Sequence, residues 1–178
     1  VSFYVQEKSI IDEEAYNRAT SVYLVDRTVP MLPEKLCNDL CSLKPNEDKL
    51  AYSVIFQMNE DAKVLNYIIR RTVINSDQRL CYEEAQEIIE QNRTETEVEK
   101  AIVELNKLAE KLRAKRFDEG AIAFERTEAA FEIDEKGKPL RVFFKESKEA
   151  NKLIEEFMLL ANRTVATHIG KPGRGQKP

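Results

Sequence analysis

The sequence has one histidine and three cysteines among its 178 residues. These counts argue against a disulfide scaffold and against a four-ligand zinc site. The odd number of thiols, with no apolar signal-peptide stretch at the start, predicts a reducing cytoplasm as the location. The sequence also lacks any run of about eighteen apolar residues, so we expect no membrane span.

The common catalytic patterns are missing as well. There is no Ser/His/Asp set, no P-loop and no G-x-G-x-x-G motif. Acidic pairs such as Glu155-Glu156 are adjacent, and adjacent helical residues point about 100° apart, so they are not ready-made metal ligands. His168, the lone histidine, is more typical of a structural residue near a helix end than of a catalyst.

Charge is unevenly distributed along the chain. Four of the 28 bases but none of the 32 acids follow Glu156, which leaves residues 1–156 with 24 bases against 32 acids. An acidic surface does not attract phosphate backbones, so composition alone argues against nucleic acid as a partner. Residues 170–178 are rich in Gly, Pro and basic side chains and predict a flexible basic tail, leaving 1–169 as one domain.

Hydrophobic periodicity predicts an α+β fold, with short antiparallel strands and packed helices. Helices are expected over 12–19, 34–42, 82–91, 95–116 and 147–168. Strands are expected at 22–24, as a hairpin over 50–58 and 63–74, and over 121–125, 129–133 and 140–145.

Finer features of the predicted helices can be tested against a structure. Thr94-x-x-Glu97 predicts a capping box and Ser147 an N-cap. Cys37 and Cys41 are expected to be small core residues beside an apolar stripe of Leu36, Leu40 and Leu43. The buried stripe of the longest central helix is expected to be Val98, Ile102, Leu105, Leu108 and Leu112.

The last predicted helix has two contrasting faces. One is apolar, with Leu153, Phe157, Leu160, Ala161 and Thr164. The other carries amides, a hydroxyl, a thioether and one carboxylate, on Ser147, Asn151, Glu155, Met158 and Asn162. Amides have low helix propensity, so this face suggests hydrogen bonding to a ligand in a polar cavity. A mildly polar solvated surface is the alternative.

Four segments, in matching order and spacing, resemble the catalytic (RNB) domain of the RNase II and RNase R exoribonucleases. They are Arg18-Ala-Thr-Ser-Val-Tyr-Leu24, Pro30-Met-Leu-Pro-Glu34 with Asn38-Asp-Leu-Cys-Ser-Leu43, Ala121-Ile-Ala-Phe-Glu125, and the segment from Ala150 to Asn162. The amino-acid sequences of the first two segments resemble RNase R more closely than RNase II. The resemblance covers essentially the whole sequence and implies a partial RNB domain.

The resemblance implies a processive hydrolytic exoribonuclease that runs from 3′ to 5′ and releases nucleoside 5′-monophosphates. Such enzymes use Mg²⁺ to activate the attacking water. Their substrate is the 3′ end of single-stranded RNA, which threads into a channel.

Four residues carry over as candidates for substrate binding. Tyr23 matches the aromatic that ends the stack of bases, and Phe124 matches the one that clamps the last nucleotide. Tyr82 and Glu155 match residues near the terminal sugar, where 2′-hydroxyl contacts separate RNA from DNA. Taken alone, Tyr23 and Phe124 would be core aromatics and Glu155 a surface carboxylate. Cys81 stands where the family often has Ser or Thr, and a thiol is expected to cap poorly.

The sequence also departs from the family by what it lacks. The family's magnesium site is an aspartate set of the form D-x(5)-D-x-D-D, which does not occur here. Because the chain starts at Val1 rather than Met, we expect an internal fragment that has the wall of the RNA channel but no catalytic or metal-binding residue. We predict that this fragment alone is inactive. The alternatives are a non-catalytic RNA- or partner-binding module on a degenerate RNB domain, and an α+β interaction domain with a chance likeness.

Overall fold

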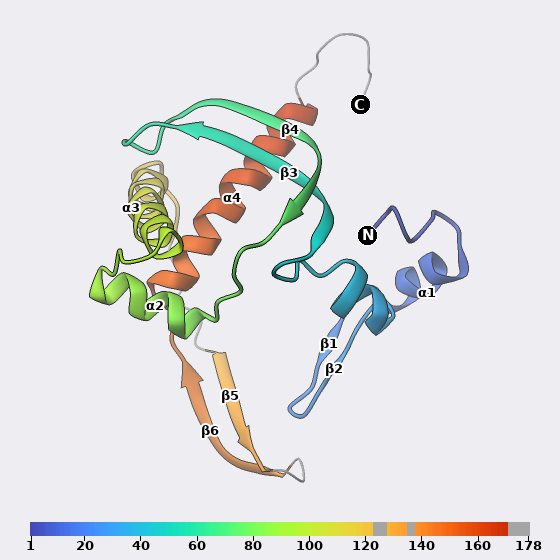
Figure 1. Cartoon of the computed structure of the whole chain (residues 1–178). Helices are drawn as coiled ribbons and strands as arrows, with labels where there is room; N and C mark the ends of the chain where they lie inside the picture. Colours follow the sequence, from blue (N-terminus) through green and yellow to red (C-terminus); the bar gives the residue numbers. More distant parts are fainter. Residues whose placement is uncertain (123–127, 135–137, 171–178) are drawn as a thin grey trace. The chain divides into compact units, whose positions relative to one another are not determined.

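The computed structural model describes residues 1–122, 128–134 and 138–170 of the chain (Figure 1). In these ranges the chain forms four α-helices, one π-helical turn and three two-stranded sheets, which confirms the α+β class. The described residues divide into two compact units. The first holds residues 1–50, 73–79, 128–134 and 138–146, and the second holds 51–72, 80–122 and 147–170.

The first unit starts with α1 (Ile10–Arg18) and the short strands β1 (Val22–Tyr23) and β2 (Thr28–Val29). Ser9 caps α1 by accepting a hydrogen bond from the Asp12 amide at 3.3 Å. β1 and β2 are antiparallel, with Tyr23 opposite Thr28. The predicted helix at 12–19 and strand at 22–24 are therefore confirmed, with small shifts in their ends.

The helix predicted after the Pro30–Pro33 turn is a single π-helical turn, Leu36–Leu40. Its bond from the Cys41 amide to the Leu36 carbonyl spans five residues, at 2.9 Å. Leu36 is buried, but Leu43 lies beyond the turn and is exposed. Cys37 is exposed and donates to the Leu32 carbonyl, so the prediction of Cys37 as a core residue was wrong.

Two longer hairpins confirm the predicted strands. β3 (Asp48–Met58) pairs with β4 (Val64–Asn75), and β5 (Glu128–Ile133) pairs antiparallel with β6 (Pro139–Lys145). The base of the β3–β4 hairpin lies in the first unit and the rest in the second. Most of the strand predicted at 121–125, part of the turn at 134–138 and residues 171–178 lie outside the described residues.

Three helices make up the core of the second unit: α2 (Tyr82–Gln91), α3 (Glu97–Asp118) and α4 (Glu149–Gly170). Each packs against the other two. The most buried apolar side chains of this unit are those of Ala62, Ile88, Val103, Ala109, Ala150 and Leu153. None of the described helices is long and apolar enough to cross a membrane.

The buried side of α3 differs from the predicted stripe. Val103, Asn106 and Ala109 are its buried residues, whereas Leu105 is 39% exposed. The reason is that α3 packs against both α2 and α4, so its most buried line runs between the two contacts. The leucine spacing of the sequence predicts only one such contact.

The capping box of α3 lies two residues later than predicted. The segment Thr94-Glu-Thr-Glu-Val-Glu99 contains the T-x-x-E pattern twice, and the second copy forms the box. The Thr96 hydroxyl accepts from the Glu99 amide at 3.2 Å, and the Glu99 carboxylate accepts from the Thr96 amide at 3.0 Å. Glu99 also pairs with Arg93 at 3.3 Å, which gives the second register an extra partner.

We expect this capping box to make stability depend on pH. The backbone amide of Thr96 holds the pKa of Glu99 below its ordinary 4.5. Such a carboxylate stabilises the fold fully above its ordinary pKa, and the contribution is lost as pH falls through the lowered value. Below about pH 4.5 the free energy of unfolding should therefore fall more steeply for the wild type than for Glu99→Gln. Urea unfolding across the acid range measures this, and parallel curves would contradict it.

Candidate functional site

Tyr23 lies on β1 in the first unit, and its ring is 81% exposed. Its strand is only two residues long and is held to β2 by a tight hairpin, in which the Leu24 amide donates to the Arg27 carbonyl at 2.8 Å. The ring makes no contact with another ring in the described part of the chain. Tyr23 is therefore not a core aromatic, and its face is free to stack on a ligand.

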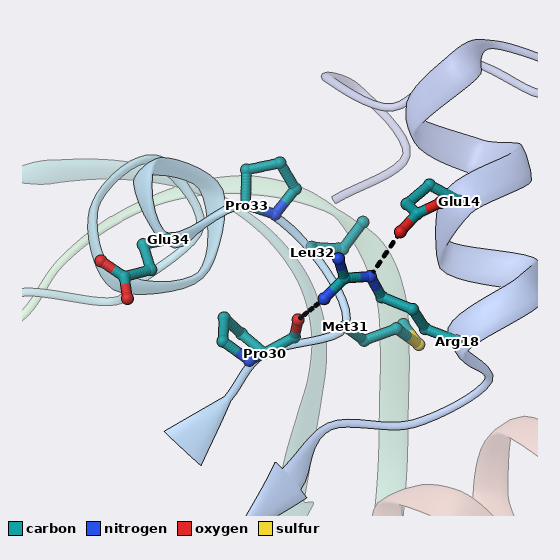
Figure 2. A pocket seen from close by; sticks show the side chains of 7 residues that line it. All are labelled: Glu14, Arg18, Pro30, Met31, Leu32, Pro33 and Glu34. Carbon is teal, nitrogen blue, oxygen red and sulfur yellow. Dashed lines mark hydrogen bonds and ion pairs between the residues drawn. The ribbon is translucent and has the colours of Figure 1, made fainter. Parts of the chain in front are cut away.

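A hollow of about 240 Å³ lies in the same unit, between α1 and the Pro30–Glu34 segment (Figure 2). Arg18 lies beside it, where its Nε contacts Glu14 Oε1 at 2.8 Å and its Nη1 donates to the Pro30 carbonyl at 3.3 Å. The first contact lies within α1, and the second ties the segment to that helix. The resemblance includes Arg18 and the Pro30–Glu34 segment, but the sequence does not predict the hollow, because its walls come from two separate segments.

Tyr82 is the first residue of α2 in the second unit and is 49% exposed. Cys81, the residue before it, caps this same helix, and its sulfur accepts from the Glu84 amide at 3.5 Å. Glu84 completes the box by accepting from the Cys81 amide at 2.7 Å, and this hydrogen bond lowers the pKa of Glu84. The thiol therefore does cap the helix, but its hydrogen bond is long. The shorter of the two hydrogen bonds in the capping box is the one that Glu84 accepts.

The adjacent pair Glu155-Glu156 on α4 is divided by burial. Glu156 is 4% exposed and Glu155 is 49% exposed. The Glu156 carboxylate receives Arg116 Nε on both oxygens, at 3.1 and 3.2 Å, and Arg116 Nη2 on Oε1 at 2.5 Å. This hydrogen bonding raises the pKa of Arg116, so the guanidinium stays charged. Glu156 thus has a structural role in the contact between α3 and α4, whereas the exposed side chain of Glu155 is accessible to a ligand.

The other residues of the polar face of α4 are also exposed or half-exposed. One of them, Asn151, makes a hydrogen bond within its own helix end. The Asn151 side chain accepts from the Lys148 amide at 3.1 Å, at the start of the helix. The first carbonyl of the helical ladder is that of Lys148, one residue after the predicted cap Ser147. Met158 and Asn162 are exposed. Capping accounts for Asn151, and the ligand-facing role of the others stays a prediction.

Two of the four predicted site residues lie in the same unit. Tyr82 and Glu155 lie on α2 and α4, which pack against each other in the second unit. Tyr23 belongs to the first unit, and Phe124 lies outside the described residues. The role of all four in substrate binding stays a prediction. Arg116, which sequence reasoning missed, carries no local signal, since it precedes its partner Glu156 by 40 residues.

The residues do not fit the Mg²⁺ that the resemblance implies. Within residues 1–122, 128–134 and 138–170, no group of three or more His, Cys, Asp or Glu side chains is placed to hold a metal ion. The two adjacent glutamates of α4 meet an arginine instead. The described residues therefore offer an exposed tyrosine at Tyr23 in the first unit and an exposed carboxylate at Glu155 in the second, and no cluster of metal ligands.

Comparison with known proteins gives one consistent result. The family model described as "RNB domain" matches residues 1–175. DIS3-like exonuclease 2 from Schizosaccharomyces pombe is 43% identical over 96% of this chain and 20% of its own length. Ribonuclease R 1 from Lactococcus lactis is 39% identical over 97% of this chain and 22% of its own. The chain thus spans about a fifth of the length of these relatives.

The solved structures that match share the fold. Mycoplasma genitalium RNase R, in complex with ribose-methylated single-stranded RNA, matches 94% of this chain and 27% of its own, with a TM-score of 0.86 and 27% identity. Yeast Ssd1, described as a pseudonuclease, matches 95% of this chain and 20% of its own, with a TM-score of 0.71 and 18% identity, which shows the fold alone. Because the family model matches 175 of the 178 residues, this chain belongs to the RNB domain family.

Proposed function

We propose that this chain supplies the wall of the RNA channel in a processive 3′-to-5′ exoribonuclease that releases nucleoside 5′-monophosphates. The proposal rests on the match of residues 1–175 to the RNB domain family. The relatives to which this chain is similar include DIS3-like exonuclease 2 and Ribonuclease R 1. The ligand is the 3′ end of a single-stranded RNA. The catalytic metal and its ligands would come from outside the described residues, which offer no such cluster.

Each predicted residue has a distinct task in this proposal. Tyr23 stacks on a base with its exposed ring, and Phe124 clamps the last nucleotide. Stacking holds any base because every base has a π-face. Tyr82 and Glu155 lie near the terminal ribose, where the carboxylate accepts a hydrogen bond from the 2′-hydroxyl that DNA lacks. The half-exposed state of Glu155 leaves it free for this contact.

A second candidate function is binding of RNA or a protein partner without cleavage. The lack of a metal-ligand cluster in the described ranges agrees with it, as it does with metal ligands supplied from outside those ranges. The fold does not decide between the two, because a protein described as a pseudonuclease shares it with RNase R. In that case Tyr23 and Glu155 would hold RNA that is never cut.

We predict that the purified chain binds single-stranded RNA and does not hydrolyse it. The test incubates a 5′-labelled oligoadenylate with the chain and Mg²⁺, separates products by length, and measures binding separately by fluorescence anisotropy. Absence of binding would contradict the proposal. Magnesium-dependent cleavage that persists in both Glu155→Ala and Phe124→Ala would show that the site is misplaced or that a contaminating nuclease is present.

A further inference from the structure

One arginine contacts both glutamates of the adjacent pair on α4. Arg116, near the end of α3, donates from Nε and Nη2 to the Glu156 carboxylate and from Nη2 to Glu155 Oε1 at 3.4 Å. Neighbouring residues on a helix point about 100° apart, so only a group lying between their two directions can reach both. The guanidinium occupies that position.

The contact with Glu156 fixes the guanidinium of Arg116. Glu156 is 4% exposed, and its two-oxygen contact with a planar fork sets the orientation of Arg116. The guanidinium carbon also lies 5.1 Å from the centre of the Phe117 ring. Arg116 is itself only 22% exposed. Its Nη2 is therefore a donor whose position is set before any ligand arrives.

Glu155 has the opposite character. It is 49% exposed, and Arg116 provides the only hydrogen bond to its carboxylate within the described residues. That bond is made to Oε1 and orients the whole carboxylate. Oε2 is thereby oriented as well, and it stays open to a ligand. An exposed glutamate without such a bond would sample several rotamers and lose entropy on binding.

We propose that Arg116 is a positioning residue for Glu155, holding its carboxylate in the orientation that accepts the 2′-hydroxyl of the terminal ribose. The proposal rests on the proposed function, in which Glu155 meets that sugar. It makes the preference for RNA over DNA depend on a residue of α3, 39 residues before the carboxylate in sequence. Glu156 serves as the anchor that fixes Arg116.

The test compares two 5′-fluorescein oligoadenylates, one all RNA and one with a 2′-deoxyribose only at the 3′ end. Anisotropy gives the Kd of the 178-residue chain for each, and the ratio of the two reports the contact with the 2′-hydroxyl. For wild type we expect a ratio on the order of ten, as for loss of one hydrogen bond to a charged group. Glu155→Gln should reduce the ratio towards one.

The variants of Arg116 are chosen so that folding does not decide the outcome. The double variant Arg116→Gln with Glu156→Gln removes the buried charge together with its partner, and should stay folded with a ratio near one. Arg116→Lys keeps a charge for Glu156 but cannot span both carboxylates, so its ratio should also fall. Arg113→Gln is the matched control, since Arg113 lies on α3 beside the same ring but contacts Glu149, and its ratio should stay at the wild-type value.

The outcomes separate this inference from the function on which it rests. A wild type that fails to bind, or fails to distinguish the two oligonucleotides, or a Glu155→Gln variant that still distinguishes them, overturns the proposed contact and the inference with it. Loss of the ratio in Glu155→Gln but not in the double variant overturns the role of Arg116 alone. Loss in both, with Arg113→Gln unchanged, supports it.

Discussion

Replacing Arg116 with methionine is expected to lower the free energy of unfolding by about 3 kcal/mol, the largest effect of any single substitution that we expect on stability. The substitution keeps much of the side-chain length but leaves the Glu156 carboxylate, 4% exposed, without its guanidinium partner. A buried charge left unpaired costs far more than the pair itself contributes. Urea unfolding followed by circular dichroism measures the loss.

Matched variants separate the buried charge from loss of packing. Arg113→Met removes an arginine of the same helix whose ion pair with Glu149 is long, at 3.9 Å, and about one-third exposed, so it should cost less than about 1 kcal/mol. Arg116→Met combined with Glu156→Met replaces the pair by apolar side chains and should recover most of the loss. Equal losses for Arg113→Met and Arg116→Met would contradict this account.

The sequence pattern predicted those elements that depend on local chemistry. The helix predicted over 82–91 has both ends at the expected residues. In the structure Cys81 and Glu84 form its capping box, and Asn92 ends it in a left-handed conformation. The hairpin formed by β3 and β4 followed from two runs of β-branched and aromatic residues around a polar turn. In these cases neighbouring residues carry all the information.

The errors concern features that the local sequence pattern does not fix. The two registers of the α3 capping box are equally good locally, and Arg93 favours the second. Cys37 is exposed because its π-helical turn buries mainly Leu36. α3 packs against both α2 and α4, and these two contacts decide which of its residues are buried. A single amphipathic stripe in the sequence does not predict two contacts.

The sequence predicts candidate site residues but not the packing around them. Resemblance to a family selected Glu155, and helical spacing places it on the polar face of α4, but the sequence does not show that Glu156 beside it is buried. Burial of Glu156 depends on Arg116 from another helix. A buried glutamate needs such a partner, yet the sequence has 28 lysines and arginines from which to choose.

Tyr23→Ala is expected to weaken binding of single-stranded RNA by about 1–3 kcal/mol, or roughly five- to 150-fold, if the ring stacks on a base. The same change should alter the free energy of unfolding by less than about 0.5 kcal/mol, because the ring is 81% exposed. Anisotropy titration with a 5′-labelled oligoadenylate measures the first, and urea unfolding the second. Tyr23→Phe keeps the ring and should bind as wild type does.

Tyr16→Ala is the control for a general loss of exposed aromatic surface. Tyr16 lies on α1 in the same unit and is 86% exposed, so its removal should leave RNA binding unchanged. Equal weakening by Tyr16→Ala and Tyr23→Ala, or no weakening by Tyr23→Ala, would contradict a stacking role for Tyr23.

The salt dependence of RNA binding gives a further check. The chain has a net charge of −4, so binding that rests on stacking should weaken only slightly as salt rises, whereas binding through phosphates would weaken steeply.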